Sequence, residues 1–333
     1  MSTTMRDVAK AAGVSVATVS HVVNDKPGAR IGDEARRRVL AAVAELGYRP
    51  NALAKTLSEG SSRFIGLVAD AIATTPFAGQ IIHGAQDEAW RHGYVLLVAN
   101  TEGNAAAEND AIAMMLEHQV RGILYSTWYH REIAVPAGLH DTEAVLVNCF
   151  ADPDAAGAVP PAVVPDEEQG GRTATEQLLA AGHRRIAFVN TTSPSPARDG
   201  RLAGYRAALE DAGIGFDPGF VFDAEPAQEG GYASAGDVVD SGATGVFCHN
   251  DRVAMGLYDG LRERGLRIPD DVAVIGFDNQ DVIAAHLRPP LSTVALPHYE
   301  LGVAGVRTLL GLDPVGDSGR VVIACPPVLR ASL

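Results

Sequence analysis

The fold of the N-terminal part of the chain is decided by one stretch, RDVAKAAGVSVATVSHVVN at residues 6–24. Thr4 lies just before it and can cap a helix, and Asp7 three residues later completes a capping box. The alanine-rich residues that follow predict a helix up to residue 12. Gly13 ends this helix, because glycine adopts the left-handed cap conformation at low cost.

A second helix is predicted for residues 16–23, after a short turn that ends at the capping residue Ser15. Its buried face consists of valines at helical spacing, namely Val19, Val22 and Val23. Its outer face carries the short side chains of Val16, Ala17, Ser20 and His21. The break at Asn24–Gly28 then separates it from a third helix.

The third helix is predicted from Asp33 to Leu46 and ends at Gly47, with a core face formed by Val39, Leu40, Val43 and Leu46. Two short helices joined by a turn, with a third helix closing the core, form the helix-turn-helix plan. The spacing alone also fits any small three-helix bundle. The short polar outer face of the second helix and the local positive charge favour the helix-turn-helix.

The charge of the chain is distributed unevenly. Residues 1–60 contain nine Lys and Arg against six Asp and Glu, and these nine include all three lysines. Their net charge is therefore +3, whereas the whole chain carries −14, so residues 61–333 carry −17. A basic head on an acidic body directs the head toward a polyanion.

The length of 333 residues predicts two or three domains, and the content of 47% hydrophobic and 20% charged residues is typical of a folded globular protein. No apolar run reaches the length of a membrane span, and the N-terminus lacks the apolar core of a signal peptide. We therefore expect a cytoplasmic protein without a membrane partner. Cys149, Cys248 and Cys325 are far apart and lie in or beside apolar runs, which favours buried free thiols over metal ligands or a redox pair.

Beyond residue 63, short apolar runs alternate with helical stretches at the spacing of βαβ units. The runs lie at residues 64–68, 94–98, 122–125, 144–147, 185–189, 244–248 and 272–276. Nearly continuous apolar strands indicate parallel sheets covered on both faces, and so many strands favour two doubly wound lobes over one sheet. No dinucleotide, P-loop, metalloprotease or hydrolase motif is found, so no cofactor, metal site or catalytic residue is assigned.

Ligands of such folds bind beyond the carboxyl ends of the strands, here in a cleft between the lobes. The candidates at these positions are Phe77, Ser126, Trp128, Asn148, Asn250, Asp251 and Asp278. Trp128 fits the core as well as the cleft, and Asp251 fits a cap of the following helix equally well.

The stretch at residues 6–24, together with LGYRPNALA at residues 46–54, resembles the lactose-repressor (LacI/GalR) family of bacterial transcription regulators. The resemblance implies an all-α helix-turn-helix head and an α/β periplasmic-binding-protein-like body of two doubly wound parallel-sheet lobes. It implies a head at 1–49, a hinge helix and linker at 50–62, and an effector-binding and dimerisation body at 63–333. The first lobe would comprise about 63–163 and 293–319, and the second about 164–292 and 320–333.

The resemblance also implies roles for residues of the head. Val16, Ala17 and His21 would face base edges in the major groove, where the apolar pair can contact a thymine methyl and His21 a guanine acceptor. Contacts mainly to phosphate would come from Ser15, Thr18, Ser20 and Asn24, and a backbone contact from Tyr48. This chain departs from the family at Gly32 and Ala35, where two hydroxyl side chains are missing.

For the hinge, the resemblance implies a short helix at 52–57 that Asn51 caps and that is marginal alone in water. Two such helices would pair across a dimer in the minor groove of a pseudo-palindromic operator, with Leu57 inserted between base pairs. The alternative is a flexible linker with an incidental leucine.

In the body, Arg201 lies in a block resembling one whose arginine contacts the effector, and Asn250 and Asp278 lie in further matching blocks. Asn148 occupies a position often held by Asp. Amide, carboxylate and guanidinium groups beside an aromatic wall suit a polyhydroxylated ligand such as a carbohydrate. Alternatively, Asp278 and Arg201 simply pair with each other.

The sequence thus predicts a homodimeric regulator that binds double-stranded DNA and a small-molecule effector. Repressor and activator are not separated by the sequence, nor are dimer and tetramer. A two-lobed solute-binding receptor is an alternative, but it would carry a signal peptide and no basic head. An enzyme with a regulatory head would require a catalytic constellation in the cleft, and none is found.

Overall fold

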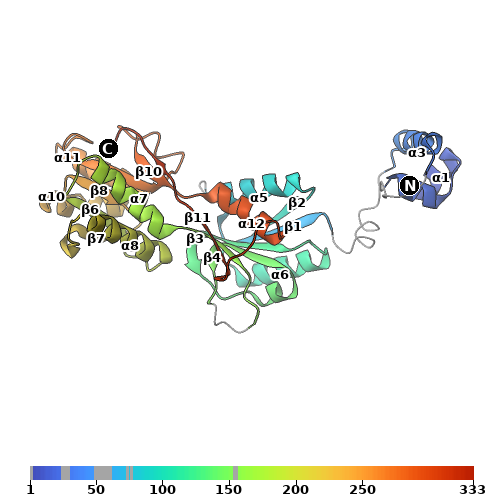
Figure 1. The fold of residues 1–333 in the computed structure, drawn as a ribbon, viewed down its shortest axis with the longest axis horizontal. Helices are drawn as coiled ribbons and strands as arrows, with labels where there is room; N and C mark the ends of the chain where they lie inside the picture. The colour runs from blue at the N-terminus through green and yellow to red at the C-terminus, as the bar shows by residue number, and fades with distance from the viewer. Residues whose placement is uncertain (1–2, 24–30, 49–61, 73–74, 76–77, 153–156) are drawn as a thin grey trace. The chain divides into compact units, whose positions relative to one another are not determined.

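The structure is a computed structural model of the 333-residue chain and describes residues 3–23, 31–48, 62–72, 75, 78–152 and 157–333. The chain forms two compact units, residues 1–63 and 64–333, which are called the head and the body below (Figure 1). The predicted hinge helix and four of the predicted site residues lie outside the described residues, namely Asn24, Asn51, Leu57 and Phe77.

The head consists of α1 (Met5–Ala12), α2 (Val16–Val23) and α3 (Asp33–Glu45), as predicted. Thr4 accepts a hydrogen bond from the Asp7 amide, and the Asp7 carboxylate accepts one from the Thr4 amide at 2.8 Å, which completes the capping box. Gly13 follows α1 with a φ of 63° in the left-handed region. The Ser15 hydroxyl accepts a hydrogen bond from the Thr18 amide at 3.1 Å and so caps α2.

The core of the head combines all three helices, and its buried side chains include Val8, Val19, Val39, Ala42 and Tyr48. The prediction that Leu40 and Leu46 belong to this core is wrong, since they are 50% and 37% exposed. Leu40 lies off the stripe that Val39 and Ala42 form at a spacing of three residues. Leu46 lies just past the end of α3, and Tyr48 packs on the core instead.

The first lobe of the body has one parallel six-stranded sheet in the order β11-β5-β4-β3-β1-β2. Its strands are β1 (Phe64–Ala69), β2 (Val95–Asn100), β3 (Ile123–Glu132), β4 (Ala144–Phe150), β5 (Ala162–Pro165) and β11 (Arg320–Ile323). Helices α5 (Gly79–Arg91) and α12 (His298–Leu309) pack on one face. Helix α6 (Ala105–Glu117) and the 3-10 helix η2 (Ala137–Asp141) cover the other (Figure 1).

The second lobe has a six-stranded sheet in the order β12-β10-β9-β8-β6-β7, in which only the edge strand β12 is antiparallel among the described strands. Its strands are β6 (Ile186–Thr191), β7 (Val221–Ala224), β8 (Gly245–Cys248), β9 (Ala273–Asp278), β10 (Ser292–Ala295) and β12 (Pro327–Val328). One face packs against α7 (Glu167–Ala180) and α8 (Pro196–Asp211), and the 3-10 helix η3 (Pro218–Phe220) precedes β7. The other packs against α10 (Ala235–Asp240) and α11 (Asp251–Glu263), and α9 (Gln228–Ala233) packs on α11.

The predicted lobe boundaries need two corrections. Strand β10 pairs with β9, so residues 293–295 belong to the second lobe rather than the first. Strand β11 pairs with β5, so residues 320–323 belong to the first lobe rather than the second. The chain therefore crosses between the lobes after β5, after β10 and after β11.

The three cysteines are free and buried, as predicted. Burial raises the pKa of the Cys149 thiol to about 12, so this group stays protonated and unreactive near neutral pH. In the part of the chain that the structure describes, none of the helices combines the length and the apolar character that crossing a bilayer requires.

Candidate functional site

The outer surface of α2 is the candidate DNA-contacting surface of the head. Val16 is 43% exposed, and Ser15 and Ala17 are exposed beside it. Thr18, Ser20 and His21 are half-buried on the same helix. The Ser15 and Thr18 hydroxyls lie 2.9 Å apart, so the cap of α2 holds both in place. The surface has short side chains that allow a close approach to a duplex.

Other residues of the head differ in how available they are for contacts with DNA. The Tyr48 ring is buried in the head core, so little of this residue is available to a DNA backbone. Gly32 precedes α3 and provides no side-chain cap. The arginines at 36–38 are exposed, and Arg37 pairs with Glu34 at 2.8 Å.

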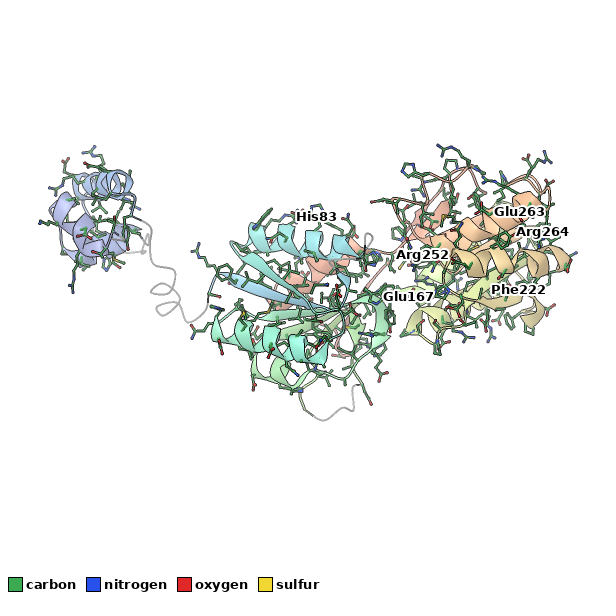
Figure 2. The ribbon with its side chains drawn as sticks, turned by 180° about the vertical axis from the view of Figure 1, so that it is seen from behind. His83, Glu167, Phe222, Arg252, Glu263 and Arg264 are labelled. Carbon is green, nitrogen blue, oxygen red and sulfur yellow. The ribbon has the colours of Figure 1, made fainter. Side chains whose placement is uncertain are left out.

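A cavity of about 350 Å³ lies between the two lobes of the body. The first lobe contributes Trp128, Tyr129 and His130, and the second contributes a polar wall that includes the predicted residues Arg201, Asn250 and Asp278. Figure 2 labels Glu167 and Arg252, which lie where the lobes meet. A volume of this size is typical of small-molecule sites.

A larger groove of about 660 Å³ adjoins the cavity and shares Arg252, Asp278 and Leu296 with it. Of the predicted effector residues that the structure describes, the groove contains only Asp278. The smaller cavity contains four of them, Trp128, Arg201, Asn250 and Asp278, so we take it as the candidate ligand site.

Arg201 is the centre of a buried polar network in this cavity and is only 3% exposed. Its Nε donates to Glu167 Oε2 at 2.8 Å, and its Nη1 donates to the His249 carbonyl. Its Nη2 lies 4.0 Å from Asp278 Oδ1, and its Cζ lies 3.6 Å from the centroid of the Phe277 ring. The direct pairing of Arg201 with Asp278 is therefore secondary to its pairing with Glu167.

The charges of this network stabilise one another. Burial alone would raise the pKa of Glu167, but the charge of Arg201 and the nearby His130 ring more than offset it and lower that pKa to about 2. Burial raises the pKa of Asp278, and Arg201 opposes this rise. His130 comes from β3 of the first lobe, and its Nδ1 lies 3.4 Å from Glu167 Oε1. Glu167 thus joins the two lobes.

Two histidines beside the network are held uncharged. Burial and then the charge of Arg201 keep the pKa of His249 well below its usual range. Burial lowers the pKa of His298 to about 4, although Glu167 acts in the opposite direction. Neither ring adds positive charge to the cleft near neutral pH.

The lowered pKa of His298 predicts that the free energy of unfolding depends on pH. The unfolded chain protonates this ring near pH 6.5, but the folded chain does so only near pH 4. The neutral ring therefore makes its full contribution to the free energy of unfolding above pH 6.5. This contribution decreases by about 3 kcal/mol as the pH falls to 4. In urea unfolding, His298→Gln should lose stability less steeply than the wild type over this range. The exposed His286→Gln is the control, and equal slopes for the wild type and His298→Gln would refute the prediction.

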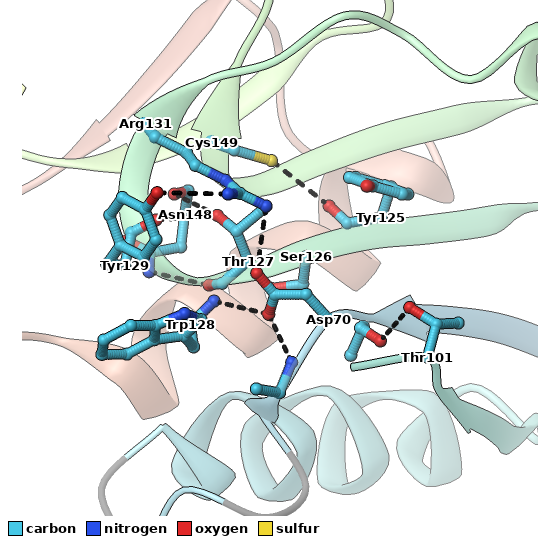
Figure 3. Close-up of polar contacts among 12 residues, drawn as sticks. Asp70, Thr101, Tyr125, Ser126, Thr127, Trp128, Tyr129, Arg131, Asn148 and Cys149 are labelled. Carbon is cyan, nitrogen blue, oxygen red and sulfur yellow. Dashed lines mark hydrogen bonds and ion pairs between the residues drawn. The ribbon is translucent and has the colours of Figure 1, made fainter. Parts of the chain in front are cut away.

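Two predicted effector residues, Ser126 and Asn148, are not among the residues that line the cavity. The buried Ser126 hydroxyl donates to the Val147 carbonyl at 2.9 Å. Asn148 Nδ2 donates to the Thr127 carbonyl at 2.9 Å (Figure 3). Asn148 also has a φ of 59°, a left-handed conformation that Asn tolerates. Both polar groups join neighbouring strands.

The same end of the first sheet contains a second network, centred on Asp70 (Figure 3). Its Oδ1 accepts from the Trp128 amide at 2.9 Å, and its Oδ2 accepts from Arg131 Nη2 at 3.1 Å. The register of β3 against β4 shifts between Ser126 and Arg131. Asp70 therefore fixes the segment that presents Trp128 and His130 to the cavity.

The helix α11 is capped by Asn250 rather than by Asp251. Asn250 Oδ1 accepts from the Val253 amide at 2.8 Å, so Asn250 caps α11 while it also lines the cavity. Asp251 is fully buried, accepts from the Gln280 amide and from the Thr293 hydroxyl, and so holds β10 near the loop after β9. The alternative that Asp251 caps the helix is wrong.

Three residues of the site, Glu167, His130 and His249, were not predicted from the sequence. His249 directly follows a predicted strand, so the rule that selected Asn250 would also have found it. The sequence around Glu167 and His130 contains no comparable signal. Glu167 follows β5 where the chain crosses between the lobes, and His130 lies on β3 where the register against β4 shifts.

A helix-turn-helix head joined to a two-lobed body with a ligand cleft defines the class of ligand-controlled DNA-binding regulators. Residues 4–51 match the profile of the bacterial regulatory proteins of the lacI family, and residues 175–333 match a periplasmic binding protein-like domain. The ribose operon repressor of Haemophilus influenzae is 33% identical over 99% of this chain and 98% of its own length. The regulator DegA of Bacillus subtilis is 33% identical over 99% of this chain and 97% of its own.

Solved structures agree with these relatives. The lac repressor dimer bound to operator and an anti-inducer superposes with a TM-score of 0.78 at 27% identity, over 100% of this chain and 99% of that one. A complex of the regulator CelR with cellobiose gives a TM-score of 0.64 at 26% identity, over 99% of both chains. The chain belongs to the lacI family of bacterial regulatory proteins. It is a DNA-binding transcriptional regulator with an effector-binding body, and the alternative of a solute-binding receptor is rejected.

Proposed function

We propose that this regulator is a cytoplasmic repressor without catalytic activity, whose two copies bind a pseudo-palindromic operator and respond to a carbohydrate. The observation that carries the proposal is the inter-lobe cavity, in which Arg201, Asn250 and Asp278 meet aromatic side chains of the other lobe. The relatives include a ribose operon repressor and a regulator in complex with cellobiose, which supports carbohydrate as the effector class.

The proposed DNA contacts are those of α2 and the segments beside it. Val16, Ala17 and His21 would contact base edges, and Ser15, Thr18 and Ser20 would contact phosphate. The proposed contacts of Asn24, Asn51 and Leu57 rest on the sequence resemblance, as does that of Phe77 with the effector. Ser126 and Asn148 would act indirectly, by fixing the strand ends beside the cavity.

The proposed mechanism couples the cleft to the DNA through the arrangement of the lobes. The contact of His130 with Glu167 joins the lobes, so a ligand seated there favours one arrangement over another. The ligand shifts DNA binding only to the extent that its affinity differs between the two arrangements. The geometry that the bodies of a dimer impose on the heads would then change operator affinity.

A thermal-shift screen of the purified protein against monosaccharides, disaccharides and nucleosides tests the effector class. A ligand that binds the native state stabilises it by mass action and so raises the melting temperature. At a ligand concentration of one hundred times its Kd, the free energy of unfolding increases by about 2.7 kcal/mol. We expect a carbohydrate to raise the melting temperature and to change operator affinity. Stabilisation by nucleosides alone would contradict the proposed class.

His21→Ala tests the proposed base contact. If the imidazole donates to a guanine, its loss should relax base choice at one operator position by about 1–3 kcal/mol, with smaller effects elsewhere. Competition binding against operators changed at single positions measures this. Uniform weakening across all sequences would instead identify His21 as a backbone contact.

A further inference from the structure

In the cleft, the guanidinium of Arg201 is already engaged on several sides. Glu167 Oε2 accepts from its Nε at 2.8 Å, and the His249 carbonyl accepts from its Nη1. Asp278 lies near its Nη2, and the Phe277 ring covers one face. An anionic ligand that approached Arg201 would have to displace a buried carboxylate from it, so this arginine is poorly placed to bind an anion.

The carboxylates and the guanidinium groups that line the cavity are equal in number. Among the described lining side chains, Glu167 and Asp278 lie with Arg201 and Arg252, and the His130 ring lies beside Glu167. His249 adds no charge near neutral pH, because burial and Arg201 keep its pKa low. An anion that entered the site would lose its hydration without meeting an unmatched cation, which is unfavourable.

The cavity also has unused hydrogen-bonding groups. Among the described residues, both ring nitrogens of His130, Oε1 of Glu167 and Nδ1 of His249 are buried and make no hydrogen bond, although His130 Nδ1 lies 3.4 Å from Glu167 Oε1. A carboxylate oxygen only accepts, and a neutral imidazole offers one donor and one acceptor. Hydroxyl groups donate and accept and therefore complement this set, whereas ionised phosphate or carboxylate groups would meet Glu167 as an acceptor facing an acceptor.

We propose that Glu167, together with His130 and His249, determines the specificity of the effector site and selects an uncharged, hydroxyl-bearing ligand over its phosphorylated or carboxylated counterparts. This inference rests on the proposed function, because it concerns the same cleft. Glu167 acts in two ways, since one oxygen occupies Arg201 and the other accepts from a ligand hydroxyl. His130 supplies the matching contact from the other lobe.

The wild-type protein provides the first test. Thermal-shift titrations at constant ionic strength compare D-ribose, D-glucose and cellobiose with D-ribose 5-phosphate, D-glucose 6-phosphate, D-gluconate and inorganic phosphate. We expect any stabilisation among these probes to come from the uncharged ones. A charged probe that stabilises as strongly as its uncharged counterpart would overturn the inference, as would stabilisation by inorganic phosphate that Arg201→Lys removes.

The second test is Glu167→Gln, with inorganic phosphate as the probe and Glu168→Gln as the matched control. Glu168 is the next residue of α7 and is exposed. Without the carboxylate, Arg201 should accept an anion, so phosphate should bind at least tenfold more tightly to Glu167→Gln than to the wild type or the control. A folded Glu167→Gln variant that shows no gain would refute the role of Glu167.

The proposed effector class and the proposed role of Glu167 can be refuted independently of each other. If circular dichroism shows that Glu167→Gln does not fold, the phosphate titrations of the wild type and Arg201→Lys decide the inference. If no sugar stabilises the wild type, carbohydrate fails as the effector class, while the response of Glu167→Gln to phosphate still decides whether Glu167 blocks Arg201.

Discussion

Arg201→Ala is expected to lower the free energy of unfolding of the body by about 3–5 kcal/mol and to abolish the response to effector. Arg201 is buried, and Glu167 is buried against it at 2.8 Å, so removal of the guanidinium leaves a carboxylate without compensation inside the protein. The loss should exceed that of a surface pair, because the low-dielectric surroundings neither hydrate nor screen the remaining charge. Urea unfolding followed by circular dichroism measures it.

Arg198→Ala is the matched control for this prediction. Arg198 lies one turn earlier on the same helix, is half-buried, pairs with the more exposed Asp199 and Asp223, and donates from Nε to the Thr191 carbonyl. Both carboxylates that its removal leaves unpaired remain in contact with water, so the loss should be about 1 kcal/mol. The double variant Arg201→Ala with Glu167→Gln should recover part of the loss, because the orphaned charge is gone. Equal effects of the two arginine variants would show that the buried network does not stabilise the body.

The second large effect is on DNA binding, which should weaken steeply with salt. If the two heads of a dimer together contact six to ten phosphates, operator affinity should fall by about 10³ to 10⁵ between 50 and 200 mM salt. The net charge of +3 on residues 1–60, against −17 on the remainder, assigns this response to the head. Fluorescence anisotropy with a labelled operator measures the slope.

The control for the salt response is a random duplex of the same length, whose weaker binding should show a comparable slope. A regulator that binds by phosphate contacts loses non-specific affinity with salt as well. An affinity that does not change over this range would remove the electrostatic basis for placing the DNA contacts on the head.

The head could be predicted closely from sequence, because its signals are local. The capping box of Thr4 and Asp7, the left-handed Gly13 and the cap at Ser15 each involve residues within four positions of one another. The burial of Tyr48 in place of Leu46 was missed, since it depends on how the chain turns after α3.

In the body, every described strand of six or more residues was predicted, but of the shorter described strands only β8 was, because it lies in a continuous apolar run. Strands β10 and β11 have four residues each, too few for a periodic pattern, and their partners decide to which lobe they belong. This is why residues 293–295 and 320–323 were assigned to the wrong lobes.

The cleft was predicted only in part, because its contacts join distant segments. Arg201, Asn250 and Asp278 reach the cavity as the strand-end rule and the family resemblance implied. Glu167 lies 34 residues before Arg201, and its pairing with that residue depends on the packing of α7 against α8. No pattern within one segment of the sequence indicates it.

Selection of binding sites from a pool of random duplexes, with the purified protein, tests whether the head binds a symmetric operator under the control of the body. We expect enrichment of one two-fold symmetric sequence, with an affinity that changes when a ligand of the cleft is added. If the selected pool has no symmetric motif and binds no better than the starting pool, with or without ligand, the assignment of residues 1–63 as an operator-binding head controlled by the body is contradicted.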